Sequence, residues 1–187
     1  LTLFQKLLNN MKKILKTKPA VFAVGDFYQI IVPVTKETVM WVRVGENCYY
    51  DDSNGILRSA KRIHKMSVPG EELEAAGEYT ICYRRIIKRK AYFSITGSVK
   101  EEKFKFKAVN GERVVAYHVA DAHNMIDEPV ACAEKFRKEI GNIDFLILNG
   151  DVPEDSGKIK NFDTVYEIVS RITAGEIPTI FSRGNHD

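Results

Sequence analysis

Three short apolar runs that alternate with two helical patterns constrain the fold of this chain more than any other feature. The runs cover residues 114–119, 145–148 and 178–181, and the helical patterns cover residues 129–140 and 161–173. Short runs of continuous apolar residues are typical of strands buried on both faces of a parallel sheet. We therefore predict a β-α-β-α-β unit over residues 113–187, the first half of an α/β domain.

The preceding part of the chain has a different pattern, in which short strand-like segments are separated by turn residues. Candidate strands span residues 20–24, 28–33, 39–44, 47–50, 64–68, 77–86, 92–97 and 102–109. Short strands at this spacing are typical of antiparallel sandwiches. We therefore predict two domains: an all-β, immunoglobulin- or fibronectin-like sandwich over residues 19–112, and a truncated α/β domain over residues 113–187.

The alternation of residues 39–44 indicates which side chains enter the sandwich core. Met40, Val42 and Val44 share one face of this strand, and Trp41 and Arg43 share the other. Residues 77–83 alternate in the same way. We expect Trp41, the one tryptophan of the chain, to be a buried core residue.

Residues 1–18 have helically spaced apolar positions with lysines away from the apolar stripe, which predicts an amphipathic helix that Pro19 ends. The apolar stripe fits packing on the protein itself or on a partner subunit, so oligomerisation through this helix stays open. Its basic face also fits an anionic membrane surface, although we favour the packing interpretation.

Composition excludes several classes of protein. No run approaches the roughly 20 apolar residues that span a bilayer, so we expect no transmembrane segment. The three cysteines, Cys48, Cys82 and Cys132, lack the paired spacing of zinc or redox motifs. We interpret them as free thiols in a reducing compartment and expect a cytoplasmic protein.

The charge of the chain is unevenly distributed. Residues 1–113 carry a net charge of +9 and residues 114–187 a net charge of −6. The strongest basic cluster, residues 83–90, places cations beside aromatic residues, but no nucleic-acid-binding motif accompanies it. We interpret this cluster as a solvated strand or hairpin face, with nucleic-acid binding as the less favoured alternative.

Polar clusters follow all three apolar runs of the predicted α/β unit, where open parallel sheets bind their ligands. Asp121 and His123 follow the first run, Asp151 follows the second, and Asn185, His186 and Asp187 follow the third. Carboxylate, imidazole and amide groups together suit divalent transition metals such as Mn, Fe, Zn or Co. Taken singly, Asp121 could cap a loop, His123 could be a surface histidine, and Gly184-Asn185 could be a turn.

The ordered motifs Asp-x-His, Gly-Asp and Gly-Asn-His-Asp resemble the opening motifs of the calcineurin-like metallophosphoesterase superfamily. The resemblance implies that Asp121 and His123 hold a first metal ion, that Asp151 bridges two ions, and that Asn185 holds the second. It implies that His186 contacts the scissile phosphate and assists the leaving group, and that Asp187 orients His186. Two divalent ions would then activate a water for attack on a phosphoester substrate.

The sequence also differs from family members. They supply two further histidine segments downstream, including a Gly-His-x-His, so we expect the site in this chain to be incomplete and these 187 residues to be inactive alone. Purple acid phosphatases have an all-β domain in front of the catalytic one, but they carry a tyrosine in their second motif that is absent here, and they have no counterpart of His123. We therefore expect a non-purple phosphoesterase.

The function predicted from the sequence is metal-dependent hydrolysis of a phosphomonoester or phosphodiester. The alternative is a binding or assembly module in which the sandwich recognises a partner and the phosphoesterase part is an inactive remnant.

Overall fold

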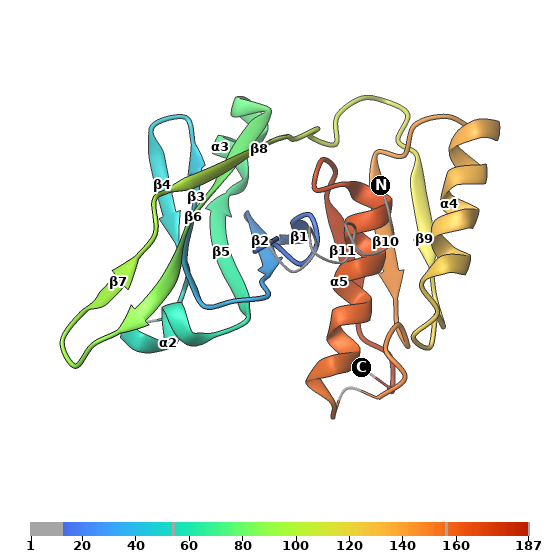
Figure 1. Cartoon of the computed structure of the whole chain (residues 1–187). Helices are drawn as coiled ribbons and strands as arrows, with labels where there is room; N and C mark the ends of the chain where they lie inside the picture. Colours follow the sequence, from blue (N-terminus) through green and yellow to red (C-terminus); the bar gives the residue numbers. More distant parts are fainter. Residues whose placement is uncertain (1–12, 54, 156, 187) are drawn as a thin grey trace, which may run out of the picture.

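The computed structural model describes residues 13–186 except residues 54 and 156, and it contains two β-sheets with helices beside both of them (Figure 1). The larger sheet is mixed and six-stranded. Its strands run in the order β5 (Ile63–Pro69), β2 (Phe27–Pro33), β1 (Ala20–Val24), β11 (Thr179–Ser182), β10 (Phe145–Asn149) and β9 (Ala116–Val119). The last three form the parallel sheet predicted for the α/β unit.

The larger sheet crosses the predicted boundary between the two domains. Strand β1 pairs in parallel with β11, with Phe22 opposite Thr179, and β1 also pairs antiparallel with β2. Strands β1, β2 and β5, which we assigned to the front domain, therefore extend the sheet of the α/β unit. The division of the chain at residues 112 and 113 stays a prediction.

The second sheet consists entirely of strands from the front part of the chain. Its order is β4 (Asn47–Tyr50), β3 (Thr38–Val44), β6 (Glu78–Arg89) and β7 (Ser94–Thr96), with β8 (Lys100–Lys105) also paired to β6. The side chains between this sheet and the β1, β2 and β5 part of the larger sheet form one core, which includes Ile30, Met40, Val42, Met66 and Ile81. The chain thus has a mixed α/β fold with two facing sheets, and an immunoglobulin type for the sandwich stays a prediction.

The other face of the larger sheet is covered by the two predicted helices, α4 (Asp127–Glu139) and α5 (Ile159–Thr173). A second core lies between helices and sheet, with Leu146 and Leu148 of β10 against Val165 and Ile168 of α5. In α4, acidic residues occupy the first turn and basic residues the last, which suits the helix dipole. No helix among the described residues is long and apolar enough to cross a membrane.

Buried polar contacts join the front part of the chain to the α/β unit. The hydroxyl of Tyr79 in β6 donates to the carbonyl of Gly175, 2.7 Å away, and Tyr79 is fully buried. A β-carbon at Gly175 would lie 2.8 Å from that hydroxyl, and the φ of Gly175 is +78°. Only glycine fits this junction without strain.

Two short helices and one side chain differ from the sequence predictions. Helices α2 (Gly55–Ala60) and α3 (Gly70–Ala76) form where we expected turns. Trp41 is half-buried beside Tyr50 rather than in the core, with the ring centroids 6.0 Å apart. The predicted alternation explains this position, because Met40, Val42 and Val44 occupy the core-facing side of β3.

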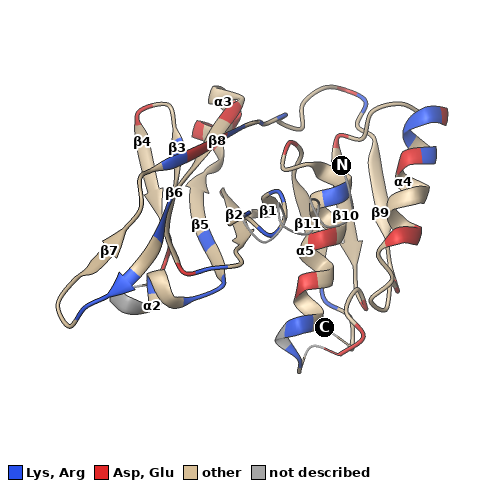
Figure 2. Cartoon of the chain, viewed as in Figure 1, with Lys and Arg blue, Asp and Glu red and all other residues tan. Residues whose placement is uncertain are grey.

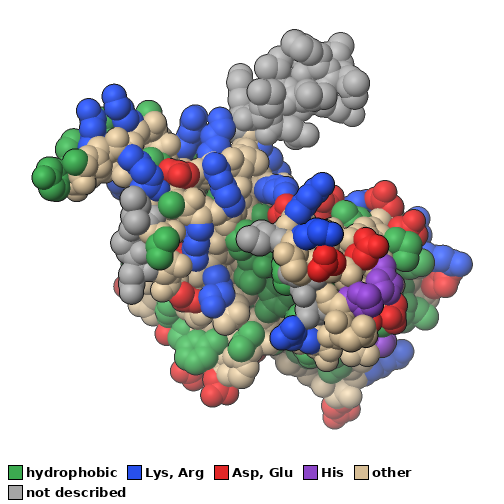
Figure 3. Space-filling view, turned by 90° about the horizontal axis from the view of Figure 1, so that it is seen from below, with side chains coloured by type: hydrophobic (Ala, Val, Ile, Leu, Met, Phe, Trp, Pro, Cys, Tyr) green, Lys and Arg blue, Asp and Glu red, His purple; other side chains and the backbone are tan. Residues whose placement is uncertain are grey.

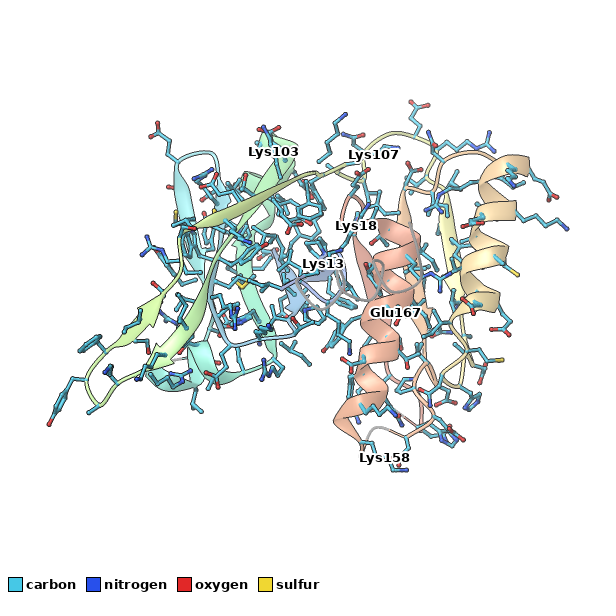
Figure 4. The ribbon with its side chains drawn as sticks, in the orientation of Figure 1. Lys13, Lys18, Lys103, Lys107, Lys158 and Glu167 are labelled. Atoms are coloured by element: carbon cyan, nitrogen blue, oxygen red, sulfur yellow. The ribbon has the colours of Figure 1, made fainter. Side chains whose placement is uncertain are left out.

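The helix predicted for residues 1–18 lies, up to residue 12, outside the described residues. Residues 13–18 are not helical, and Leu15 instead forms an isolated bridge with Val34. The segment runs beside α5: Lys16 pairs with Asp163 at 2.6 Å, and Figure 4 shows Lys13 and Lys18 close to the helix that carries Glu167. This part of the segment packs on the protein itself.

Candidate metal centre

The polar clusters predicted to bind metal lie at one edge of the larger sheet. Strands β9, β10 and β11 are parallel, so their C-terminal ends meet there. Asp121 and His123 follow β9, Asp151 follows β10, and Asn185 and His186 follow β11. Figure 3 shows histidine and acidic side chains together on this face of the molecule.

Three of the predicted ligands come close enough to share an ion. One ligand atom each from Asp121, His123 and Asp151 lies within 4.8 Å of the other two. Asp121 and His123 are exposed, and Asp151 is half-buried. Two carboxylates and an imidazole at this separation suit a divalent transition metal.

The backbone at all three residues has an unusual conformation. The φ angles of Asp121, His123 and Asp151 are +52°, +43° and +53°, in the left-handed region that residues other than glycine adopt uncommonly and that Asp, Asn and His adopt more readily than most. Asn124, directly after His123, has a φ of +65°. Such conformations cluster at functional sites, where the surrounding structure holds the strain in place.

Backbone hydrogen bonds between the two loops maintain this conformation. The N–H of Asp121 donates to the carbonyl of Gly150 at 3.1 Å, and the N–H of His123 donates to the carbonyl of Asp151 at 3.0 Å. The N–H of Asn124 continues the series by donating to Val152 at 3.0 Å. The loop after β9 is thereby tied to the loop after β10, and the ligands of both are held in register.

Two glycines allow the loop after β11 to cross next to Asp151. A β-carbon at Gly184 would lie 2.3 Å from the Oδ1 of Asp151 and 2.6 Å from its backbone nitrogen. A β-carbon at Gly150 would lie 2.9 Å from the Cα of Gly184. The glycines of the Gly-Asp and Gly-Asn motifs are thus explained by direct backbone contact.

His186 adjoins the three clustered side chains. Its backbone N–H donates to the Oδ1 of Asp151 at 2.8 Å, and its ring centroid lies 5.2 Å from that of His123. Its Nδ1 lies 2.9 Å from the carbonyl oxygen of Glu154. Because a carbonyl only accepts, Nδ1 carries a proton and Nε2 is left for another partner.

The remaining predicted residues have less defined places. Asn185 is exposed on the same loop, between Gly184 and His186. Asp187 lies outside the described residues. Of the two other histidines, His64 is fully buried and hydrogen-bonded to Thr38 and Asp51, whereas His118 is exposed on β9.

Two residues at this edge were missed by the sequence reasoning. The Nδ2 of Asn124 donates to a carboxylate oxygen of Glu154 at 3.3 Å, while its Oδ1 is buried with no hydrogen-bond partner among the described residues. Glu154 therefore positions both Asn124 and the ring of His186. The sequence carries no motif for this pair, although Asn124 directly follows the Asp-x-His motif.

The loop after β10 adds further negative charge near His186. The N–H of Gly157 donates to Asp155 at 2.8 Å and Lys158 pairs with it at 3.1 Å, and both contacts lower the pKa of the Asp155 carboxyl. Asp155 is therefore ionised at neutral pH. The edge combines acidic groups and imidazoles, which favours cation binding.

Comparison with known proteins agrees with the motifs. Residues 115–187 match the model of the calcineurin-like phosphoesterase family, which confirms the resemblance predicted from the three motifs. Among solved structures, the chain is similar to purple acid phosphatase PPD1 from seeds of yellow lupin (Lupinus luteus), with a TM-score of 0.50 and 14% identity. No curated protein matches the chain significantly.

The similarity to the lupin enzyme covers 92% of this chain and 36% of that protein. The chain thus spans about a third of the length of the lupin enzyme. At this level of identity the match shows a shared fold, and the expectation of a non-purple enzyme stays a prediction.

Proposed function

We propose that the protein to which this chain contributes is a calcineurin-like phosphoesterase that hydrolyses phosphoesters at the β9–β11 edge, as the family match of residues 115–187 supports. The observation that carries the proposal is the clustering of Asp121, His123 and Asp151 within 4.8 Å, each on left-handed backbone. Uncommon backbone conformations at neighbouring polar residues are typical of functional sites.

The proposed ligand set fits two divalent transition ions. Asp121 and His123 would hold one ion, Asp151 would bridge, and the side-chain oxygen of Asn185 would hold the other. Bound there, the ions supply charge stabilisation for the phosphoryl group and lower the pKa of a bound water. Metal analysis of the purified protein decides whether Mn, Fe, Zn or Co occupies the site.

The chain's own residues would orient these ligands and contact the phosphate. The hydrogen bond from the N–H of His186 to Asp151 fixes the direction of that carboxylate. The contact of His186 Nδ1 with Glu154 fixes the tautomer of the imidazole. When the ring also carries a proton at Nε2, as the imidazolium, that nitrogen can donate a hydrogen bond to a phosphate oxygen and give its proton to the leaving group, a role in which Asp187 would orient the ring.

Hydrolysis of p-nitrophenyl phosphate and bis-p-nitrophenyl phosphate with added Mn²⁺ tests the proposal and separates monoesterase from diesterase activity. The assay is run on this chain and on the complete gene product. We expect the complete product to turn over one of these esters and Asp151→Asn to lose at least about 100-fold in activity. Asparagine tolerates left-handed backbone, so the variant retains the loop.

Glu139→Gln is the matched control, because Glu139 is an exposed carboxylate at the end of α4, away from the edge. It is expected to keep full activity. Absence of turnover and of bound metal in the complete product would contradict the enzyme and favour the binding or assembly module. Turnover by these 187 residues alone would contradict the expectation that the site is incomplete.

A further inference from the structure

A β-hairpin projects from the second sheet, away from the α/β unit (Figures 1 and 2). It consists of the end of β6, strand β7 and the turn between them. The N–H of Lys90 donates to the carbonyl of Phe93 at 2.8 Å, which leaves Ala91 and Tyr92 at the tip. This hairpin, residues 84–97, contains the basic cluster that the proposed phosphoesterase activity does not use.

The hairpin exposes large apolar side chains that a soluble surface normally buries. Tyr92 is 98% exposed, Phe93 63%, Ile87 62% and Ile95 42%. All four belong to one short segment, and the two most distal are aromatic. Large exposed apolar side chains gathered on a protruding element mark an interaction site.

The same hairpin is strongly basic. Between Glu78 and Glu101 the sequence has no acidic residue, while positions 84–90 contain five cations. Arg89 is held by Glu37 at 2.9 Å. Among the described residues, no ion pair is formed by the exposed cations Arg84, Arg85, Lys88 and Lys90.

Strand register places cations and apolar groups on the same face of the hairpin. Lys88 lies opposite Ile95, and the hydrogen bond that closes the turn sets Lys90 opposite Phe93. Arg89 and Ser94 form the other face, where Arg89 also contacts Ser59 of α2. The face with Lys88, Lys90, Phe93 and Ile95 is therefore turned away from the rest of the protein, with Tyr92 at its end.

We propose that this hairpin docks the protein on an anionic phospholipid surface. Tyr92 and Phe93 would enter the headgroup region, while Lys88 and Lys90 behind them contact lipid phosphates and carboxylates. Aromatic side chains at the tip and lysines further back match the change from apolar to charged at a membrane interface. The docking is peripheral and independent of the proposed phosphoesterase activity.

Nucleic acid is the other polyanion that such a basic segment fits, and the aliphatic residues decide against it. Bases stack on aromatic rings, but the exposed Ile87 and Ile95 offer no stacking surface and gain by entering lipid. The hairpin is also a protrusion, whereas single-stranded nucleic acid follows a positively charged groove. A lipid surface uses all of the exposed groups.

Co-sedimentation of the chain with phosphatidylcholine vesicles, with and without about 30% phosphatidylserine, tests the proposal. We expect binding only to the anionic vesicles, and weaker binding at higher salt. Lys88→Gln with Lys90→Gln should weaken it by more than tenfold, since each cation near such a surface contributes about fivefold. Tyr92→Ser with Phe93→Ser should weaken it by a similar or larger factor.

The matched controls are Lys135→Gln with Lys138→Gln, two exposed cations of α4, and Ile140→Ser, an exposed apolar residue after that helix. They should leave vesicle binding unchanged. Because the hairpin protrudes, unchanged thermal unfolding of all variants verifies that they fold.

A spectroscopic measurement places the tip in the lipid. In Tyr92→Trp combined with Trp41→Phe, the only tryptophan is at the tip, and its emission should shift to the blue with anionic vesicles. If both hairpin variants bind vesicles as tightly as the native chain, the proposal is overturned, because another segment then makes the contact with lipid. It is also overturned by an absence of vesicle binding, or by tighter binding to a single-stranded oligonucleotide than to the vesicles.

Discussion

The front part of the chain and the metal edge of the α/β unit use left-handed backbone in opposite ways. Before residue 114, the described residues with positive φ are all glycines, at turns such as Gly25, Gly45 and Gly77. At the β9–β11 edge, Asp121, His123, Asn124 and Asp151 adopt the same conformation although each has a β-carbon. In the front part this conformation occurs at glycines, whereas at the edge it occurs at polar residues, three of which hold their ligand atoms within 4.8 Å of one another.

The largest effect of a substitution on the free energy of unfolding is expected in the front part of the chain. Asp51 is buried and accepts hydrogen bonds from Ser53 and His64 and a salt bridge from Lys61 at 2.7 Å. Asp51→Ala leaves these donors unpaired and should lower the free energy of unfolding by about 3–5 kcal/mol. Urea denaturation measures this loss. A loss below about 1 kcal/mol would mean that this buried cluster does not stabilise the front part.

The same cluster should make the protein acid-sensitive. Burial lowers the pKa of His64, which outweighs the opposing effect of Asp51, so the folded protein holds the ring neutral. The unfolded chain takes up a proton below about pH 6.5, and stability present above that pH is lost as the pH falls. Burial opposes ionisation of Asp51, but the Lys61 contact and two backbone hydrogen bonds lower its pKa overall, which adds a loss below about pH 4.

Urea midpoints between pH 8 and pH 5 should therefore fall for the native protein and fall less for His64→Gln. An equal fall in both would show that other groups control the pH dependence.

The second effect contrasts two glycines. Gly184→Ala places a β-carbon against Asp151 and should cost about 2 kcal/mol, together with most of the affinity for Mn²⁺. Gly45→Ala has open space around it and a φ of +55°, so it should cost only about 1 kcal/mol of backbone strain and leave metal binding unchanged. Denaturation and calorimetric titration of both variants provide the comparison. Equal metal affinity in the two would contradict the close crossing at Asp151.

The third effect concerns the junction between the two parts. Tyr79→Phe removes the hydroxyl that satisfies the carbonyl of Gly175 and should cost about 1–2 kcal/mol. Tyr83→Phe is the control, because that hydroxyl contacts Glu102 in a more accessible position. Thermal unfolding of both variants tests whether Tyr79→Phe loses more stability than Tyr83→Phe. A larger loss for Tyr83→Phe would contradict this expectation.

The smallest expected effect is the difference in stability between glycine and alanine at a left-handed position of the β9–β11 edge. At Asp121, glycine should be more stable than alanine by about 1 kcal/mol, because only glycine adopts positive φ freely. At Asp26, a turn residue of the front part without positive φ, alanine should be more stable than glycine by about 0.5–1 kcal/mol. Urea denaturation of the four variants checks both signs. The same sign at the two positions would remove the contrast between the two regions.

Local patterns in the sequence predicted most elements because side-chain alternation and helical spacing reflect burial. The bounds of β1 and β4 match the prediction, and α4 and α5 begin and end within two residues of it. The gathering of Asp121, His123 and Asp151 also followed from a general rule, since parallel strands bring their C-terminal ends to one edge.

Features that depend on contacts between residues far apart in the chain were not predicted from the sequence. The parallel pairing of Phe22 in β1 with Thr179 in β11 joins residues far apart in the chain, and no periodicity records it. The left-handed backbone of Asp121 goes with a hydrogen bond from its N–H to Gly150 in the next loop, a contact that no local sequence pattern records. Helix α3 begins at Gly70, between two predicted strands where we predicted no helix, and it buries Leu73.

The central claim is that the β9–β11 edge is a metal site, and calorimetric titration of Mn²⁺ into this chain tests it most directly. We expect saturable binding by the native sequence, a loss of at least about 10-fold in affinity for Asp121→Asn, and no change for Glu139→Gln. Absence of saturable binding, or equal affinity in all three proteins, would contradict the assignment of this strained edge to a metal centre.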